Sequence, residues 1–238
     1  MQPELVHYLP IGTTVLAAVF CTILLRRYFA KRTSLHLLWW GLGVMAYGIG
    51  TALESSVTLF GNTVWLTKAW YIAGALLGGY PLAQGSAYLL ADRKTADRLT
   101  WITLPFITVV ALLVILSPVV PEALEPYRPT GSILAWVWVR ALTPFINLYA
   151  VAFLVGGAIY SSWRFAKTPG EGHGQRAFGN AFIAVGGILP GIGGTLAKTG
   201  VIEALYIGEF AGLILIWIGF VINVRAPRPV PSQPAMAQ

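Results

Sequence analysis

Charged residues are scarce in this 238-residue sequence. They make up 11% of it, against roughly 25% in soluble domains, whereas 56% of the residues are hydrophobic and the mean hydropathy is +0.70. This composition excludes a soluble enzyme and a disordered chain, and it predicts a membrane protein. The net charge is +7. In so apolar a chain, we interpret this charge as loop charge beside membrane spans and expect no nucleic-acid partner.

Cysteine and histidine are also rare, with one Cys and three His. Cys21 alone cannot form a disulfide framework, a CxxC redox pair or a thiolate zinc site. The histidines are expected at the membrane interfaces, His7 outside and His36 and His173 inside, which disfavours haem and catalytic zinc. We therefore expect no cofactor and no metal.

Catalytic motifs are missing as well. The chain contains no HExxH, GxSxG or Walker sequence. The last apolar stretch has no lysine that could form a retinal Schiff base. No acid, base and nucleophile fall together, so we predict that the protein is not an enzyme, and an enzyme acting on lipids is the least favoured function.

What the sequence does contain is seven long apolar stretches. A helix needs roughly 20 mostly apolar residues to cross the hydrocarbon core of a bilayer. The pattern predicts an all-α fold, a polytopic seven-transmembrane-helix bundle that occupies residues 1–225. The stretches are Leu9–Leu25, Leu35–Ser55, Val64–Leu90, Leu99–Ser117, Ile133–Ser161, Phe178–Thr199 and Ala204–Val224.

The positions of the cations predict the orientation. Twelve of the sixteen Lys and Arg fall in alternate connections and in the tail, all on one side of the membrane if the seven stretches span it. Lys and Arg are retained on the cytoplasmic side, so the N-terminus is predicted outside and the C-terminus inside, in a bacterial cytoplasmic (inner) membrane. The twelve are Arg26, Arg27, Lys31, Arg32, Arg93, Lys94, Arg98, Arg164, Lys167, Arg176, Arg225 and Arg228.

The two ends of the chain lie outside the seven apolar stretches. No positive segment precedes the first apolar stretch, so we expect this stretch to be retained as a span and not cleaved as a signal peptide. Residues 226–238 are rich in proline and lack apolar periodicity, which predicts a disordered cytoplasmic tail.

Stretch 178–199 is unusually rich in glycine. Gly186, Pro190 and Gly194 are spaced by four, as are Gly187 and Gly191, and Pro190 removes a backbone hydrogen bond. The pattern is typical of tight helix packing with a fixed kink. A hinge or broken helix that lines a cavity is the alternative.

Ionisable residues inside the membrane are expensive and therefore point to function. They gather in the predicted outer half, where helical spacing adds polar companions, and Gln84 lies deeper on a polar stripe. We predict a polar pocket that binds a small ligand. The candidate ligand-binding residues are Glu54, Lys68, Arg140, Asn147, Tyr206, Glu209 and Gln84.

The same charges also allow a purely structural interpretation. Glu54 could pair with Lys68, and Glu209 with Arg140 or Lys198, which would hold the bundle together without binding anything. Both interpretations remain open at the level of the sequence.

A resemblance to known proteins is confined to residues 35–90. The run KAWYIAGALLGGYPLAQGSAYLL is similar to a stretch of uncharacterised bacterial seven-helix membrane proteins, and other positions resemble the N-terminal seven-helix sensor region of bacterial histidine kinases. These positions are Trp40, Leu53, Glu54, Trp70, Tyr71, Gly74 and Pro81. The resemblance implies a signal-sensing bundle. No kinase follows the last stretch in this sequence, so such a sensor is expected to act through a partner protein.

The function expected from the sequence is a membrane sensor or accessory protein that binds a small molecule, an ion or a lipid in its outer half. Its partners would be membrane lipids and a membrane or cytoplasmic signalling protein. The alternative is a small transporter or an ion or proton channel that uses Glu54 and Glu209, motivated by the Gly/Pro-interrupted stretch 178–199.

Overall fold

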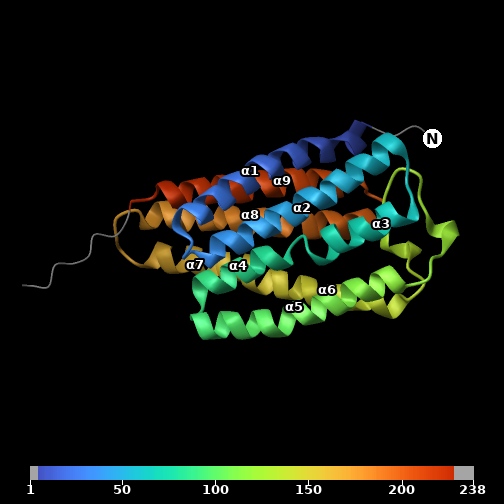
Figure 1. Ribbon diagram of the computed structural model, residues 1–238. Helices are drawn as coiled ribbons and strands as arrows, with labels where there is room; N and C mark the ends of the chain where they lie inside the picture. The colour runs from blue at the N-terminus through green and yellow to red at the C-terminus, as the bar shows by residue number, and fades with distance from the viewer. Residues whose placement is uncertain (1–4, 228–238) are drawn as a thin grey trace, which may run out of the picture.

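The computed structural model describes residues 5–227 and shows an elongated bundle of helices (Figure 1). Within these residues the fold is all-α, and the only extended pairing is an isolated bridge between Val119 and Leu134. Five helical rods are long and apolar enough to cross a membrane, so the prediction of a polytopic helical membrane protein is confirmed at this level. They are Leu5–Lys31, Arg93–Leu116, Val137–Lys167, His173–Lys198 and Glu203–Arg225.

The helices coincide with the predicted apolar stretches but several extend beyond them. The α-helices are α1 (Leu9–Lys31), α2 (Leu35–Phe60), α3 (Val64–Trp70), α4 (Tyr80–Leu90), α5 (Arg93–Leu116), α6 (Val137–Ala150), α7 (Gly157–Lys167), α8 (His173–Lys198) and α9 (Glu203–Arg225). Short 3-10 turns are η1 (Leu5–Tyr8), η3 (Pro121–Ala123) and η4 (Gly131–Ile133), and π-helical segments are η2 (Tyr71–Leu76) and η5 (Val151–Gly156). Most of the extensions carry Lys and Arg residues, which are good helix formers even where they end an apolar span.

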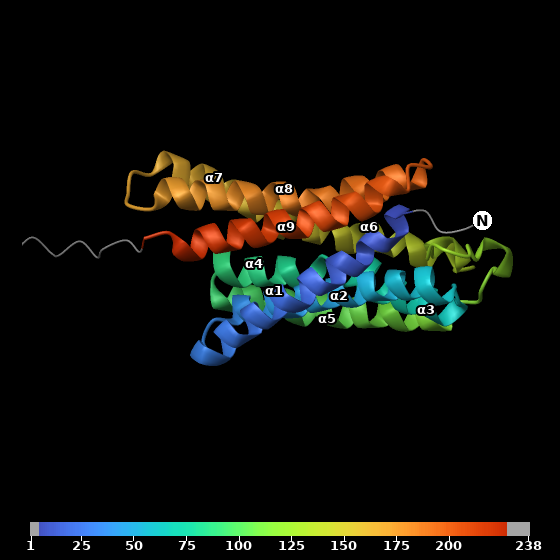
Figure 2. The same cartoon turned by 90° about the horizontal axis from the view of Figure 1, so that it is seen from above.

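The two ends of the bundle differ in their connections. The described N-terminus, the α2–α3 turn and the long connection 117–136 lie at one end, and the α1–α2, α4–α5 and α7–α8 connections lie at the other (Figure 1, Figure 2). The second end carries eleven of the twelve cations of the predicted cytoplasmic side, because only Arg228 lies outside the described residues. We call it the cation-rich end, and the opposite one the loop end.

Two rods contain π-helical segments. Between α3 and α4 the π turn η2 is followed by a break at residues 77–79, and Pro81 then occupies the first turn of α4. Proline is favoured at that position because it has no backbone N–H to donate to the preceding turn. The third predicted stretch, Val64–Leu90, is therefore two helices in line. Between α6 and α7, η5 continues the rod without a break.

Helices α8 and α9 lie side by side in both views (Figure 1, Figure 2). Glycines let their backbones touch: a Cβ atom on Gly186 would lie 2.6 Å from the Gly212 carbonyl oxygen, and one on Gly208 would lie 2.7 Å from that of Leu189. Helix α8 runs unbroken through Pro190. The broken-helix alternative for this stretch is therefore wrong, and close packing is observed, as small residues permit.

The long connection 117–136 is folded onto the bundle. Ile133 and Leu134 are fully buried and join a core cluster with Tyr71, Leu76 and Tyr80. Asn62 donates hydrogen bonds to the backbone oxygens of this connection. The fifth predicted stretch begins at Ile133, whereas α6 begins at Val137, because apolar residues at the edge of a span are indistinguishable from the span itself.

The predicted disordered tail, residues 226–238, lies outside the described residues except for its first two. Ala226 is buried, and the Pro227 carbonyl accepts a 3.2 Å hydrogen bond from Arg176 of α8. These two residues belong to the packed bundle.

Candidate functional site

Two of the predicted site residues meet inside the loop end of the bundle. Glu54 of α2 is 2% exposed, and its carboxyl group lies within hydrogen-bonding reach of the carboxyl group of Glu209 on α9. Glu54 lies less than two turns before the end of α2, and Glu209 less than two turns after the start of α9. We call this arrangement the carboxyl pair.

Side chains from four elements surround the carboxyl pair. Trp70 of α3 donates its indole N–H to Glu54 Oε1 at 2.7 Å, and Tyr47 of α2 donates its hydroxyl to the backbone oxygen of Glu209 at 2.9 Å. Tyr206, 1% exposed, lies one turn before Glu209, and the ring of His7 from η1 packs against it with centroids 5.6 Å apart. The pair is therefore enclosed by aromatic rings.

The carboxyl pair has fewer hydrogen-bond donors than its oxygens require. The Oε2 atoms of both Glu54 and Glu209 are buried and have no hydrogen-bond partner among the described residues. Two facing carboxylates without a counter-charge repel each other strongly in a low-dielectric interior. The arrangement needs a positive species between the two groups, and a proton or a small cation satisfies it.

The ion pairs predicted as the structural alternative are not formed. Within residues 5–227 the only salt bridges are Arg93–Asp97 and Arg128–Glu125, both between residues of one local segment. Lys198 is exposed at the end of α8. The expected pairing of Glu54 with Lys68, and of Glu209 with Arg140 or Lys198, is therefore wrong.

Lys68 instead holds the end of a neighbouring helix. Its ammonium group is buried and donates to the carbonyl oxygens of Ile115 and Ser117, at 2.8 and 2.7 Å. These carbonyls belong to the C-terminal end of α5, where a helix lacks internal donors and where its dipole favours a cation. Lys68 thus fixes α5 against α3 and does not face the carboxyl pair.

Two other candidates lie apart from the pair. Asn147 is exposed on α6, on a surface that includes Phe145 and Leu148, so its assignment to a ligand pocket is not supported by its position. Arg140, partly buried on the same helix, lies near the Tyr71 hydroxyl. Helical spacing predicts that Arg140 and Asn147 lie on one face of their helix. In the structure, Asn147 instead lies on the exposed side of α6.

Gln84 belongs to a second polar cluster, deeper and toward the cation-rich end. Its side chain is fully buried, donates to the Ala96 carbonyl at 3.0 Å and to Thr100 Oγ1 at 2.8 Å, and accepts from the Tyr149 hydroxyl. Tyr88 extends this Gln84 network to Asp97. Every polar atom of the Gln84 amide is thus in use, and it ties α4, α5 and α6 together.

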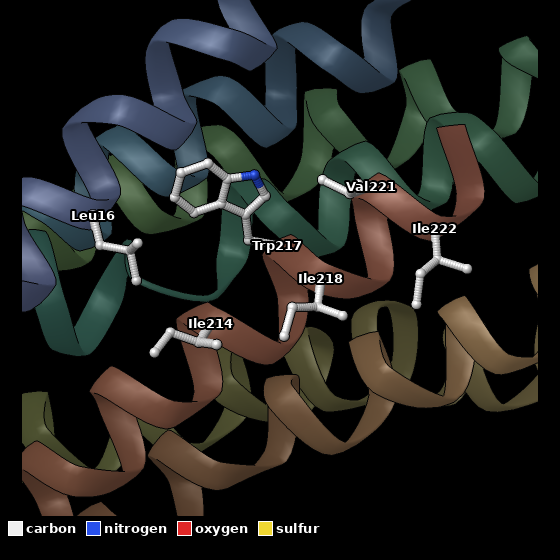
Figure 3. Close-up of a pocket in the computed structure, with 6 residues that line it drawn as sticks. All are labelled: Leu16, Ile214, Trp217, Ile218, Val221 and Ile222. Carbon is white, nitrogen blue, oxygen red and sulfur yellow. The ribbon is translucent and has the colours of Figure 1, made fainter. Parts of the chain in front are cut away.

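Two cavities of the described residues are apolar. A groove of about 270 Å³ lies on the surface between α1 and α9, and a gap of about 10 Å³ lies in the core. Figure 3 shows the six residues that line the groove, Leu16, Ile214, Trp217, Ile218, Val221 and Ile222. Neither cavity is lined by Glu54 or Glu209, so neither of them is the polar pocket predicted for the outer half.

Comparisons with known proteins do not identify the chain, because no protein-family model, curated protein or solved structure matches it. The resemblance noted from the sequence therefore stays an expectation.

Three residues of the site were not among the sequence candidates. Trp70, Tyr47 and His7 contact the carboxyl pair or its neighbour Tyr206. Tyr47 shares a helix face with Glu54, which is a signal that spacing offers. Trp70 and His7 come from other elements, and aromatic residues near a membrane interface are too common to mark a site.

Proposed function

We propose that the chain crosses a bacterial inner membrane seven times, with its N-terminus outside. Five rods are long and apolar enough to do so. Helix α2 and the rod formed by α3 and α4 run alongside these five and would be the other two spans (Figure 1). The gathering of connections with Lys and Arg at one end, opposite the N-terminus, supports this orientation because such residues stay in the cytoplasm. Exposed apolar side chains along α5 and α6 are suited to lipid contact.

We further propose that the protein is a membrane sensor or accessory subunit whose outer-half site binds a small cation, in the simplest case a proton. The observation that carries this proposal is the pair of facing carboxyl groups with two buried, unpartnered oxygens. An anionic ligand is disfavoured because, within residues 5–227, no Lys or Arg forms an ion pair with either carboxyl group. The aromatic enclosure by Trp70, Tyr47 and Tyr206 keeps other counter-ions away.

The site offers a direct route from binding to a change in shape. Losing the bound cation would leave two negative charges facing each other on α2 and α9, and their repulsion favours separation of these helices. Helix α9 is locked to α8 by glycine contacts and ends in Arg225 at the cation-rich end. A movement of α9 would therefore reach the cytoplasmic surface, where a partner protein could read it.

The transporter alternative keeps Glu54 and Glu209 as its candidate ion sites, but no broken helix supports it, because α8 is continuous through Pro190. Ion movement is still directly testable in proteoliposomes that carry a pH-sensitive dye. We expect no flux above that of empty liposomes under proton, Na⁺ or K⁺ gradients. Flux that Glu209→Gln abolishes would overturn the assignment as a sensor and make the carboxyl pair a transport site.

Infrared difference spectroscopy of the reconstituted protein tests the site. Exchange between acidic and alkaline buffer should change the C=O stretching band of a protonated carboxyl group in the wild type. Both Glu54→Gln and Glu209→Gln should remove that change, because each variant destroys the pair. Glu203→Gln is the matched control, since Glu203 is exposed at the start of the same helix.

Two outcomes decide the identity of the ion. A band change that is the same in choline, Na⁺ and K⁺ buffers supports a proton, whereas one that is suppressed by only one metal ion supports that ion. If the change in the carboxyl band persists in both single variants, the pair binds neither a proton nor a metal ion. The proposed site would then be wrong.

A further inference from the structure

The groove between α1 and α9 is a second feature that the carboxyl pair does not explain. It is lined by hydrocarbon side chains and one indole, with Leu16 from α1 and the other residues from α9 (Figure 3). Trp217, at its centre, is only partly buried and stacks on Phe20 of α1, with ring centroids 5.3 Å apart. This stacking gives the groove a rigid floor.

Both walls of the groove end in an arginine. Arg27 follows Leu16 by three helical turns on α1, and Arg225 follows Ile214 by three turns on α9, so each arginine continues the stripe of groove residues on its helix. The two helices run in the same direction, because both start at the loop end (Figure 1). The two arginines therefore lie at the same end of the groove.

The positive charge at this end is available for a ligand. Arg27 and Arg225 are exposed, and among residues 5–227 neither forms a salt bridge. The Arg27 guanidinium lies 5.5 Å from the ring centroid of Phe220 on α9, which shows that it reaches across from α1. A guanidinium is well suited to a phosphate group, since it can donate two parallel hydrogen bonds to it.

The distance along α9 from Ile214 in the groove to Arg225 matches the thickness of one leaflet. Three turns of helix measure about 16 Å, and half of the hydrocarbon core measures about 15 Å. An acyl chain lying along Ile214, Ile218 and Val221 would thus extend from the centre of the membrane to the level of the arginines. Charge and length together point to one kind of occupant.

We propose that this groove is a binding site for an anionic phospholipid of the leaflet at the cation-rich end. One acyl chain fills the groove against Trp217, and the phosphate group is held between Arg27 and Arg225. The site is independent of the carboxyl pair, which lies toward the loop end.

Quenching of tryptophan fluorescence by brominated lipids tests the proposal. The full chain is reconstituted in phosphatidylcholine vesicles that contain brominated phosphatidylglycerol or, in parallel, brominated phosphatidylcholine. The signal of Trp217 is the difference between the wild type and Trp217→Phe. We expect phosphatidylglycerol to be preferred at Trp217 by about tenfold or more, since each arginine near a charged headgroup contributes about fivefold.

Variants separate a specific site from general attraction to a negative surface. The double variant Arg27→Gln, Arg225→Gln should lose the preference, whereas Arg27→Lys, Arg225→Lys should keep most of it. Arg98→Gln is the matched control, because Arg98 is an exposed arginine at the same end but on α5. It should leave the preference unchanged.

Three results would overturn the proposal. Equal quenching by both lipids in the wild type would mean that only ordinary boundary lipid contacts Trp217. A preference that survives in the double glutamine variant would place the headgroup elsewhere. A preference that falls as far in Arg98→Gln would assign it to surface charge. None of these results depends on ion binding at the carboxyl pair.

Discussion

The two buried polar clusters of the bundle are built in opposite ways. In the Gln84 network every polar atom of the amide has a partner, from the Ala96 carbonyl, the Thr100 hydroxyl and the Tyr149 hydroxyl. In the carboxyl pair two acidic groups face each other, and one oxygen of each has no partner. A satisfied network stabilises a fold, whereas an unsatisfied one costs stability and is retained for another reason. In a membrane bundle, a buried polar group that lacks a hydrogen-bond partner is thus a stronger indication of function than a buried polar group that has one.

The largest effect that this contrast predicts is at Gln84. Replacing Gln84 by Leu removes three hydrogen bonds and leaves the Tyr149 hydroxyl of α6 without its partner, whereas Ala96 and Thr100 of α5 still bond each other. We expect the free energy of unfolding to fall by about 2 to 3 kcal/mol, as measured in mixed micelles with increasing dodecyl sulfate. Asn147→Leu, at an exposed position, should change it by less than about 0.5 kcal/mol. Equal effects at the two positions would show that the network does not stabilise the bundle.

An intermediate effect is expected at Lys68. Replacing it by Met removes two charge-assisted hydrogen bonds to the end of α5, which should lower the free energy of unfolding by about 1 to 2 kcal/mol. Arg140→Met, a matched loss of one cation, should cost less than about 0.5 kcal/mol because no hydrogen bond of Arg140 is seen among the described residues. The measurement is the same micelle unfolding. If the two costs were reversed, Arg140 and not Lys68 would be the structural cation.

The smallest effect, and the one that sharpens the comparison most, is at the carboxyl pair. Glu209→Gln supplies an N–H donor to the Glu54 carboxyl and removes one negative charge, so the free energy of unfolding should stay within about 0.5 kcal/mol of the wild type or rise. The same value should be obtained for Glu54→Gln. A loss of more than about 2 kcal/mol in either variant would contradict the view that the pair is retained for binding and would make it structural.

The sequence predicted part of the site because the depth of a residue along a helix can be counted from the ends of the apolar stretch. Glu54 and Glu209 were placed at a similar depth in this way, and they do meet. Lys68 and Arg140 were placed there as well, but they face other neighbours. Depth is a property of one helix, whereas the direction of a side chain around the helix axis depends on the helices beside it.

The fold, like the site, was predictable from the sequence only in part. Hydropathy and charge by themselves determined that the protein is a helical membrane protein, where its helices lie along the chain and which connections share the cations, since these follow from the cost of placing polar groups in hydrocarbon. Only the tertiary structure decided that Gly186 and Gly212 bring α8 and α9 into backbone contact, that the rod near Pro81 is divided, and that two carboxyl groups face each other with no ion pair to a Lys or Arg within residues 5–227. The physical reason is that lipid is as apolar as the side chains, so local shape and hydrogen bonding between helices, and not hydropathy, select which faces meet.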